Sequence, residues 1–137
     1  MKRLLSFFNS ISSERKSDET NFRSNGVLTL GAEVELQIID PKSLNLSPRA
    51  EDIINHTLAD KKIKPELYLS TVEINSGKCN NVFEIEKDLS ESFDLINKIA
   101  NDIDVKLATT GSHPFSRYSD CLITQTTRYN DLIDRNQ

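Results

Sequence analysis

The chain has 137 residues, of which 36% are hydrophobic and 28% charged, and its formal net charge at pH 7 is −4. This length suits one domain, and the composition is typical of a globular protein rather than a disordered or fibrous one. Acidic and basic residues are interleaved without a long basic stripe, so we expect no nucleic-acid partner. No apolar run approaches the roughly 18 residues that cross a bilayer, so we expect no membrane partner.

The first part of the chain differs in composition from the rest. Residues 12–26 are polar and rich in serine, asparagine and charge, so we expect residues 1–26 to be a flexible lead-in and residues 27–137 to be the folded domain. The apolar stretch within residues 1–11 is short and has no signal-peptide cleavage site after it. Cys79 and Cys121 are isolated, which is typical of reduced thiols in a cytoplasmic protein.

Residues 28–39 alternate between apolar and polar side chains, which predicts a strand with one buried face. Two glutamates, Glu33 and Glu35, fall on the polar side. The predicted apolar face carries Leu28, Leu30, Ala32, Val34, Leu36 and Ile38, and the predicted polar face carries Thr29, Gly31, Glu33, Glu35 and Gln37.

Residues 67–75 repeat this pattern and predict a second strand. Tyr68, Ser70, Val72 and Ile74 would share one side, and Glu73 and Asn75 would lie on the other. Three carboxylates, Glu33, Glu35 and Glu73, could therefore meet on one face of a sheet. Neighbouring carboxylates repel unless a cation screens them, and hard oxygen ligands suit Mg²⁺, which indicates a nucleotide-using site. The alternative is that they are ordinary polar residues on the solvated face of a one-sided sheet.

Two helices are expected beside these strands. Ser47 ahead of Pro48 predicts a capped helix over residues 48–61, with Ile53, Ile54, Thr57 and Leu58 as its buried stripe. Asn80 or Asn81 can cap a longer helix over residues 82–104. Its stripe should lie against the apolar face of the sheet and contains Val82, Ile85, Leu89, Phe93, Ile96, Ile99 and Ile103.

The last part of the chain predicts a strand over residues 105–110, a loop over 111–115 and a short helix or its approach over 124–134. His113 precedes a proline at the end of the strand, which could present it toward whatever lies over the sheet. A loop histidine in water is the alternative. The elements together predict an α+β fold, in which a mostly antiparallel sheet carries helices on one face.

Four segments in this order resemble a known enzyme family. They are LGAEVELQIIDP, TVEINSGKC, ATTGSHPFSRY and TTRYNDL, and they span about residues 27–133. In this order and spacing they are similar to the N-terminal part of the ATP-dependent carboxylate–amine ligases of the glutamate–cysteine ligase type 2 family. That family has the glutamine-synthetase-like superfold, so the resemblance implies a partial fold of this kind.

The resemblance also implies a function. A cytoplasmic ligase of this kind uses ATP and Mg²⁺ to join a carboxylate to an amine, with glutamate and cysteine, the step toward glutathione biosynthesis, as the family's leading pair. Glu33, Glu35 and Glu73 would then hold the metal, and Asn75, His113 and Arg128 would line the substrate or the nucleotide.

Family members are much longer than 137 residues, so we expect this chain to be a truncated form that corresponds to the N-terminal third of such an enzyme, and both activity and inactivity of the chain alone stay open. We therefore expect self-association or a complementary chain as a partner, besides amino acids and ATP. The alternative function is a non-catalytic remnant or split subunit that acts as an interaction module.

Overall fold

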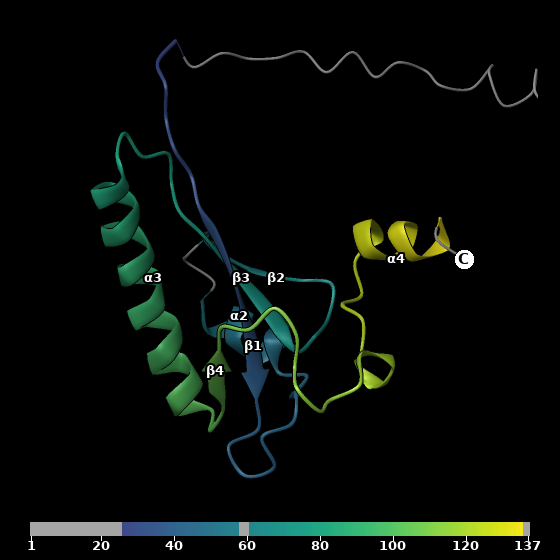
Figure 1. Cartoon of the computed structure of the whole chain (residues 1–137). Coiled ribbons are helices and arrows are strands. Elements are labelled where there is room, and N and C mark those ends of the chain that lie inside the picture. Colours follow the sequence, from purple (N-terminus) through teal and green to yellow (C-terminus); the bar gives the residue numbers. More distant parts are fainter. Residues whose placement is uncertain (1–25, 58–60, 136–137) are drawn as a thin grey trace, which may run out of the picture.

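The computed structural model describes residues 26–57 and 61–135. Four strands form one antiparallel sheet of order β2-β3-β1-β4 (Figure 1), which confirms the expected α+β class. The strands are β1 (Glu33–Ile39), β2 (Ile63–Pro65), β3 (Thr71–Asn75) and β4 (Lys106–Ala108). The helices are α2 (Ala50–His56), α3 (Val82–Asp102) and α4 (Thr127–Asp134), with a short 3-10 helix over Tyr118–Asp120. The predicted lead-in lies, except for Gly26, outside the described residues.

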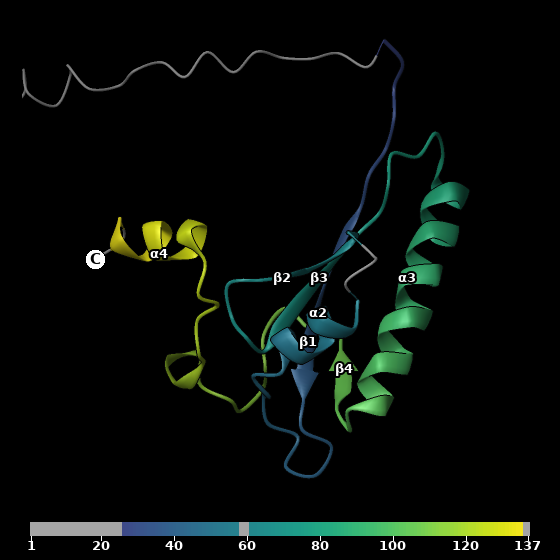
Figure 2. The same cartoon turned by 180° about the vertical axis from the view of Figure 1, so that it is seen from behind.

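Helices α2 and α3 cover one face of the sheet, as expected (Figure 2). Each fully buried large side chain contributes roughly 1.5–3 kcal/mol through the apolar area that it removes from water. The alternation along β1 and β3 supplies one side of this core and the helical stripes supply the other. The largest fully buried side chains are Leu36, Ile38, Val72 and Ile74 from the sheet and Ile53 and Ile96 from the helices.

The first strand is shorter than its sequence pattern predicts. β1 begins at Glu33 rather than Leu28, and the side chain of Leu28 is 99% exposed. Glu33 pairs with Asn75, the last residue of β3, so the neighbouring strand ends where β1 begins. Before that point the chain makes an isolated bridge between Leu30 and Cys79. The alternating pattern therefore predicted a longer strand than the structure has, because the neighbouring strand β3 ends at Asn75.

The second predicted strand is also shorter, because residues 67–70 form a loop. β3 begins at Thr71, whose amide donates to the carbonyl of Tyr68 at 2.9 Å in a turn. This loop joins β3 to β2, a strand that the sequence analysis missed. β2 contains Pro65, which argues against a central strand but is tolerated at a sheet edge, and β2 is an edge strand.

Helix α2 begins at Ala50 rather than Pro48, and no side chain caps it, so the predicted cap at Ser47 is wrong. The amide of Ala50 instead donates to the carbonyl of Leu69 at 2.8 Å. A carbonyl distant in the sequence thus accepts the hydrogen bond that a capping side chain would otherwise accept from the first turn of the helix. The helix ends at His56, short of the predicted Lys61, and Leu58 of the predicted stripe lies outside the described residues.

Helix α3 and its cap agree more closely with the prediction. Asn81 accepts a hydrogen bond from the amide of Glu84 at 3.0 Å, as an N-cap does. Of the predicted stripe, Ile96 and Ile99 are buried. Ile85, Leu89, Phe93 and Ile103 are partly buried. Val82 is 62% exposed because the first turn extends past the sheet. Asp104, with φ of 55°, turns the chain from α3 into β4, which pairs antiparallel with β1.

Helix α4 lies away from α3, on the far side of the sheet from it (Figures 1 and 2). Thr126 caps it by accepting a hydrogen bond from the amide of Tyr129 at 3.3 Å. None of the helices in the described part of the chain is both long enough and apolar enough to cross a membrane.

Candidate functional site

Three carboxylates meet on the face of the sheet that α2 and α3 leave uncovered. Glu35 and Glu73 share this face, as the alternation predicted, and the register of β1 and β3 sets them directly opposite each other. Carboxylate oxygens of Glu35, Glu66 and Glu73 all lie within 4.8 Å of one another. We call these three residues the carboxylate cluster. Glu33 lies on the same face one pleat further along β1, opposite Asn75, and outside this cluster.

Glu66 is the member that the sequence analysis missed. It directly follows Pro65, the last residue of β2, and its amide donates to the carbonyl of Thr71 at 3.4 Å. The hairpin of β2 and β3 therefore brings Glu66 back beside Glu73, seven positions later. The sequence analysis missed this proximity because it treated residues 67–75 as one continuous strand. A turn predicted within residues 66–70 (ELYLS) would have indicated that Glu66 lies beside Glu73.

Negative charge is concentrated in the carboxylate cluster. Desolvation raises the pKa of Glu35 above its usual value, and the negative charges of Glu66, Glu73 and Glu33 raise it further. Lys64 lies opposite Glu73 in the register of β2 and β3. In residues 26–57 and 61–135, however, none of the three cluster carboxylates forms an ion pair. A divalent cation would relieve this repulsion.

Asn75 lies next to the cluster on β3. Its side-chain amide donates to a carboxylate oxygen of Glu73 at 2.5 Å. Asn75 therefore fixes the orientation of Glu73 in this structure, and the binding role that the resemblance implies for Asn75 stays a prediction.

A cleft of about 770 Å³ adjoins the cluster and contains Glu35 in its wall. Its lining is about equally polar and apolar, with hydroxyl groups from several parts of the chain and the exposed backbone of a glycine. The lining residues are Glu33, Val34, Glu35, Gln37, Tyr68, Thr71, Thr109, Thr110, Gly111 and Tyr118. Glu35 thus belongs both to the carboxylate cluster and to a cleft large enough for a small molecule.

Gln37 organises the floor of this cleft. Its buried side chain donates to the hydroxyl of Tyr118 at 3.0 Å and accepts from the hydroxyl of Thr110 at 2.8 Å. Three segments far apart in the sequence are therefore joined through one amide. The sequence analysis placed Gln37 on the correct face but did not identify Tyr118, because its segment shows no periodic pattern.

His113 is buried and lies outside the lining of the cleft. Its Nδ1 accepts a hydrogen bond from the amide of Ser116 at 3.0 Å, so its Nε2 carries the proton that is donated to the carbonyl of Leu44 at 2.9 Å. Both ring nitrogens hold backbone groups of two loops together. The role in binding that the resemblance implies for His113 stays a prediction, and in this structure the ring acts as a clamp between loops.

Arg128 lies at the start of α4 and is exposed. Its guanidinium lies 5.4 Å from the centre of the Tyr129 ring. The structure therefore does not bring Arg128 into the lining of the described cleft, and its predicted role in binding also stays a prediction.

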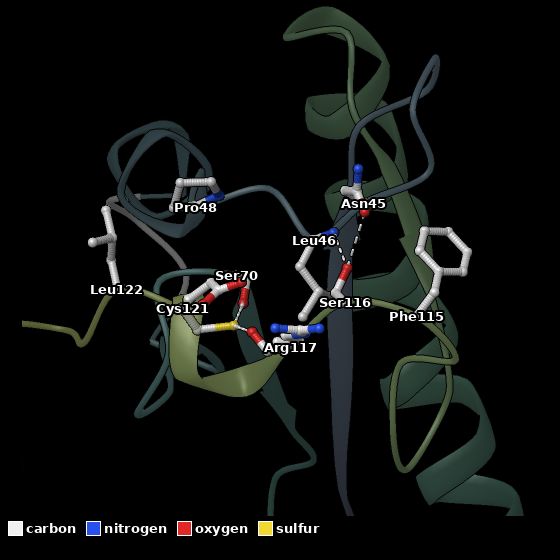
Figure 3. Close-up of a pocket in the computed structure, with 10 residues that line it drawn as sticks. Asn45, Leu46, Pro48, Ser70, Phe115, Ser116, Arg117, Cys121 and Leu122 are labelled. Carbon is white, nitrogen blue, oxygen red and sulfur yellow. Dashed lines mark hydrogen bonds between the residues drawn. The ribbon is translucent and has the colours of Figure 1, made fainter.

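A second cavity, of about 370 Å³, lies between the start of α2 and residues 115–122 (Figure 3). The hydroxyl of Ser70 donates to the Sγ of Cys121 at 4.0 Å, and Arg117 and Asp120 provide one charge of each sign. None of the cluster carboxylates lines it. This cavity is therefore separate from the cleft that contains Glu35.

Comparison with known proteins places the sequence in a family. The sequence model of the family described as "Glutamate-cysteine ligase family 2" matches residues 29–137, which is most of the chain. This chain belongs to glutamate–cysteine ligase family 2. The match contains β1, β3, the cleft and the whole carboxylate cluster.

Curated relatives carry matching names. A Gloeobacter violaceus protein named "Putative glutamate--cysteine ligase 2" is 39% identical over 118 residues, covering 83% of this chain and 32% of its own length. A Bdellovibrio bacteriovorus protein of the same name is 36% identical, covering 85% of this chain and 31% of its own. A Rhodococcus jostii protein named "Putative glutamate--cysteine ligase 2-2" is 37% identical, covering 80% of this chain and 30% of its own length. The chain thus spans about a third of the length of these relatives.

Proposed function

We propose that this chain is the front part of an ATP- and Mg²⁺-dependent ligase that joins glutamate to cysteine through an amide bond. The observation that carries the proposal is the carboxylate cluster, which lies inside the segment that matches the glutamate–cysteine ligase family. The names of the relatives supply the choice of glutamate and cysteine as substrates.

The donor atoms of the cluster fit Mg²⁺. Mg²⁺ prefers hard oxygen ligands, and carboxylates within 4.8 Å of one another can reach a single ion. We assign Glu35, Glu66 and Glu73 as the residues that hold it, with Glu33 adding negative charge from the same face. Bound there, the ion would neutralise charge on a phosphoryl group during transfer.

The neighbouring cleft is where we expect the substrate and the nucleotide to meet the cluster. Thr109, Thr110 and Tyr118 offer hydroxyl groups in its wall, and Gly111 leaves room for a close approach to the backbone. Gln37 holds Tyr118 and Thr110 in place through two hydrogen bonds. These residues bind and orient, which is the main task of a protein that catalyses phosphoryl transfer. The free thiols of Cys79 and Cys121 suit the reducing cytoplasm.

The alternative function is a split subunit that needs a complementary chain. β2 and β4 are the edges of the described sheet and pair on one side only, and the chain spans about a third of the length of its relatives. An edge that lacks a partner can accept a strand from another chain.

Phosphate release from ATP tests both candidates. The chain is incubated with Mg²⁺, ATP, glutamate and cysteine, with and without a chain that corresponds to the remaining two thirds of a relative. Release that depends on glutamate without the second chain supports the ligase, and release that appears only with it supports the split subunit. A lack of glutamate-dependent release in both mixtures would contradict the proposed activity. Glu73→Gln should abolish the release, whereas Glu91→Gln on the exposed surface of α3 should leave it unchanged.

A further inference from the structure

Glu66 is anchored at both oxygens of its carboxylate. One oxygen accepts a hydrogen bond from the amide of Leu67 at 2.9 Å. The other lies 3.3 Å from the hydroxyl of Tyr129, which follows it by 63 positions in the sequence. A side chain held at both oxygens has lost the rotational freedom that a free glutamate at a loop would keep.

The segment that carries Tyr129 is itself fastened to the loop that follows Glu66. The amide of Thr124 donates to the carbonyl of Leu67 at 2.8 Å, and the amide of Leu69 donates to the carbonyl of Leu122 at 2.9 Å. The buried hydroxyl of Thr124 also donates to the carbonyl of Glu66, at 2.5 Å. The backbone and the side chain of Glu66 are therefore both fixed from the same later segment.

Among the described residues of α4, Tyr129 is the buried one, with 6% of its surface exposed. Its hydroxyl also lies 3.4 Å from the carbonyl of Pro65, so it sits beside both residues at the end of β2. The rest of α4 projects away from the sheet (Figure 1). The contact that docks this helix is thus also the contact that reaches the carboxylate cluster.

We propose that Tyr129 is a positioning residue for the metal site, holding Glu66 in the orientation that completes the carboxylate cluster. This inference rests on the proposed function, because it takes the cluster as a Mg²⁺ site. Mg²⁺ demands near-ideal octahedral geometry, whereas Ca²⁺ accepts flexible and irregular coordination. A positioning residue should therefore matter more for Mg²⁺ than for Ca²⁺, and a residue that only stabilises the fold should affect both ions equally.

The test compares Mg²⁺ and Ca²⁺ binding to the full chain by calorimetry. Tyr129→Phe keeps the ring in the core and removes the hydroxyl. It should weaken Mg²⁺ binding about tenfold, in the range known for groups that orient metal ligands, and weaken Ca²⁺ binding less. Asn130→Ala, at the exposed next position of α4, is the matched control and should change neither affinity.

Two further results separate the explanations. Glu66→Gln and the double variant with Tyr129→Phe form a cycle, and we expect the double variant to bind Mg²⁺ no more weakly than Glu66→Gln. Additive losses would overturn the inference, because Tyr129 would then act without Glu66. The ratio of the two affinities is unaffected by partial unfolding, since both fall by the same factor. A wild-type chain that binds no Mg²⁺ would contradict the proposed metal site, whereas normal binding by Tyr129→Phe would overturn the inference and leave the metal site intact.

Discussion

The two faces of the sheet differ in how they are completed. Along β3, Ile74 points into the core and is fully buried, whereas Glu73 and Asn75 on either side of it point to the uncovered face. Helices α2 and α3 close the first face, and the second carries the carboxylate cluster and the cleft. The alternation of β3 therefore separates residues that pack in the core from residues that lie on the uncovered face.

The two faces of the sheet also differ in the ion pairs that their acidic residues form. Beside the helices, Asp88 pairs with Lys62 and Asp52 pairs with Arg49. On the uncovered face, the described residues provide no ion pair for Glu35, Glu66 or Glu73. The proposed metal site therefore combines carboxylates that lie close together and have no ion-pair partner among the described residues.

The largest expected effect comes from adjacent residues of β3. Ile74→Ala should lower the free energy of unfolding by about 3 kcal/mol, because it removes buried methyl groups and leaves a cavity. Glu73→Gln, one position away on the other face, should leave it unchanged or raise it. Urea denaturation measures both variants. Equal losses of stability would contradict the assignment of the two faces.

His113→Ala should have the next largest effect, a loss of about 2 kcal/mol, because the ring holds backbone groups of Leu44 and Ser116. The exposed His56 provides the control, and His56→Ala should change stability little. Thermal unfolding gives the result, together with Mg²⁺ affinity measured well below the melting temperature. A stable variant with weakened Mg²⁺ binding would return His113 to the binding role that the resemblance implies.

Asp88→Asn should cost about 1 kcal/mol at pH 7. The side chain of Lys62 and the amide of Gly77 donate to Asp88 and lower its pKa from the usual value of 3.8. Its contribution is present above the unfolded pKa and is lost as the pH falls through the lower folded pKa. The difference from wild type should therefore shrink in acid, with the exposed Asp94→Asn as control. A difference that does not shrink as the pH falls would contradict the ion pair as its cause.

Glu35→Gln should have the smallest effect and the opposite sign, a rise in Tm of about 1–3 °C at pH 7. Desolvation and the charges of Glu66, Glu73 and Glu33 raise the pKa of Glu35 above 4.5. The folded state is thus relatively more stable below the unfolded pKa of 4.5, and this advantage is lost as the pH rises through the raised folded pKa. The gain from Glu35→Gln should vanish near pH 4. A lower Tm at pH 7 without added metal would rule out this repulsion.

The sequence predicted the parts of the fold that depend on local periodicity. The core sides of β1 and β3, the length of α3 and the cap at Asn81 are confirmed because hydrophobic alternation and capping are local properties. The cap at Ser47 failed because Leu69, distant in sequence, supplies the partner of Ala50. The predicted first residues of β1 and β3 are also wrong, because the extent of a strand depends on where its neighbouring strand ends.

For the candidate site, the sequence could predict which carboxylates share a face but not which of them meet. Glu35 and Glu73 come together through strand register, whereas Glu66 replaces Glu33 in the cluster through a hairpin turn. The anchoring of Glu66 by Tyr129 spans 63 positions and follows no local pattern. Long-range contacts of this kind become visible only in the folded chain.

Mg²⁺ titration by calorimetry at pH 7 tests the central claim most directly, with wild type, Glu35→Gln, Glu73→Gln and the helix-surface control Glu91→Gln. The account predicts one Mg²⁺ site in wild type and in the control, and binding at least about tenfold weaker in the two cluster variants. Equal Mg²⁺ binding in all four chains, or none in wild type, would contradict it, and the uncovered face would then be an ordinary solvated surface.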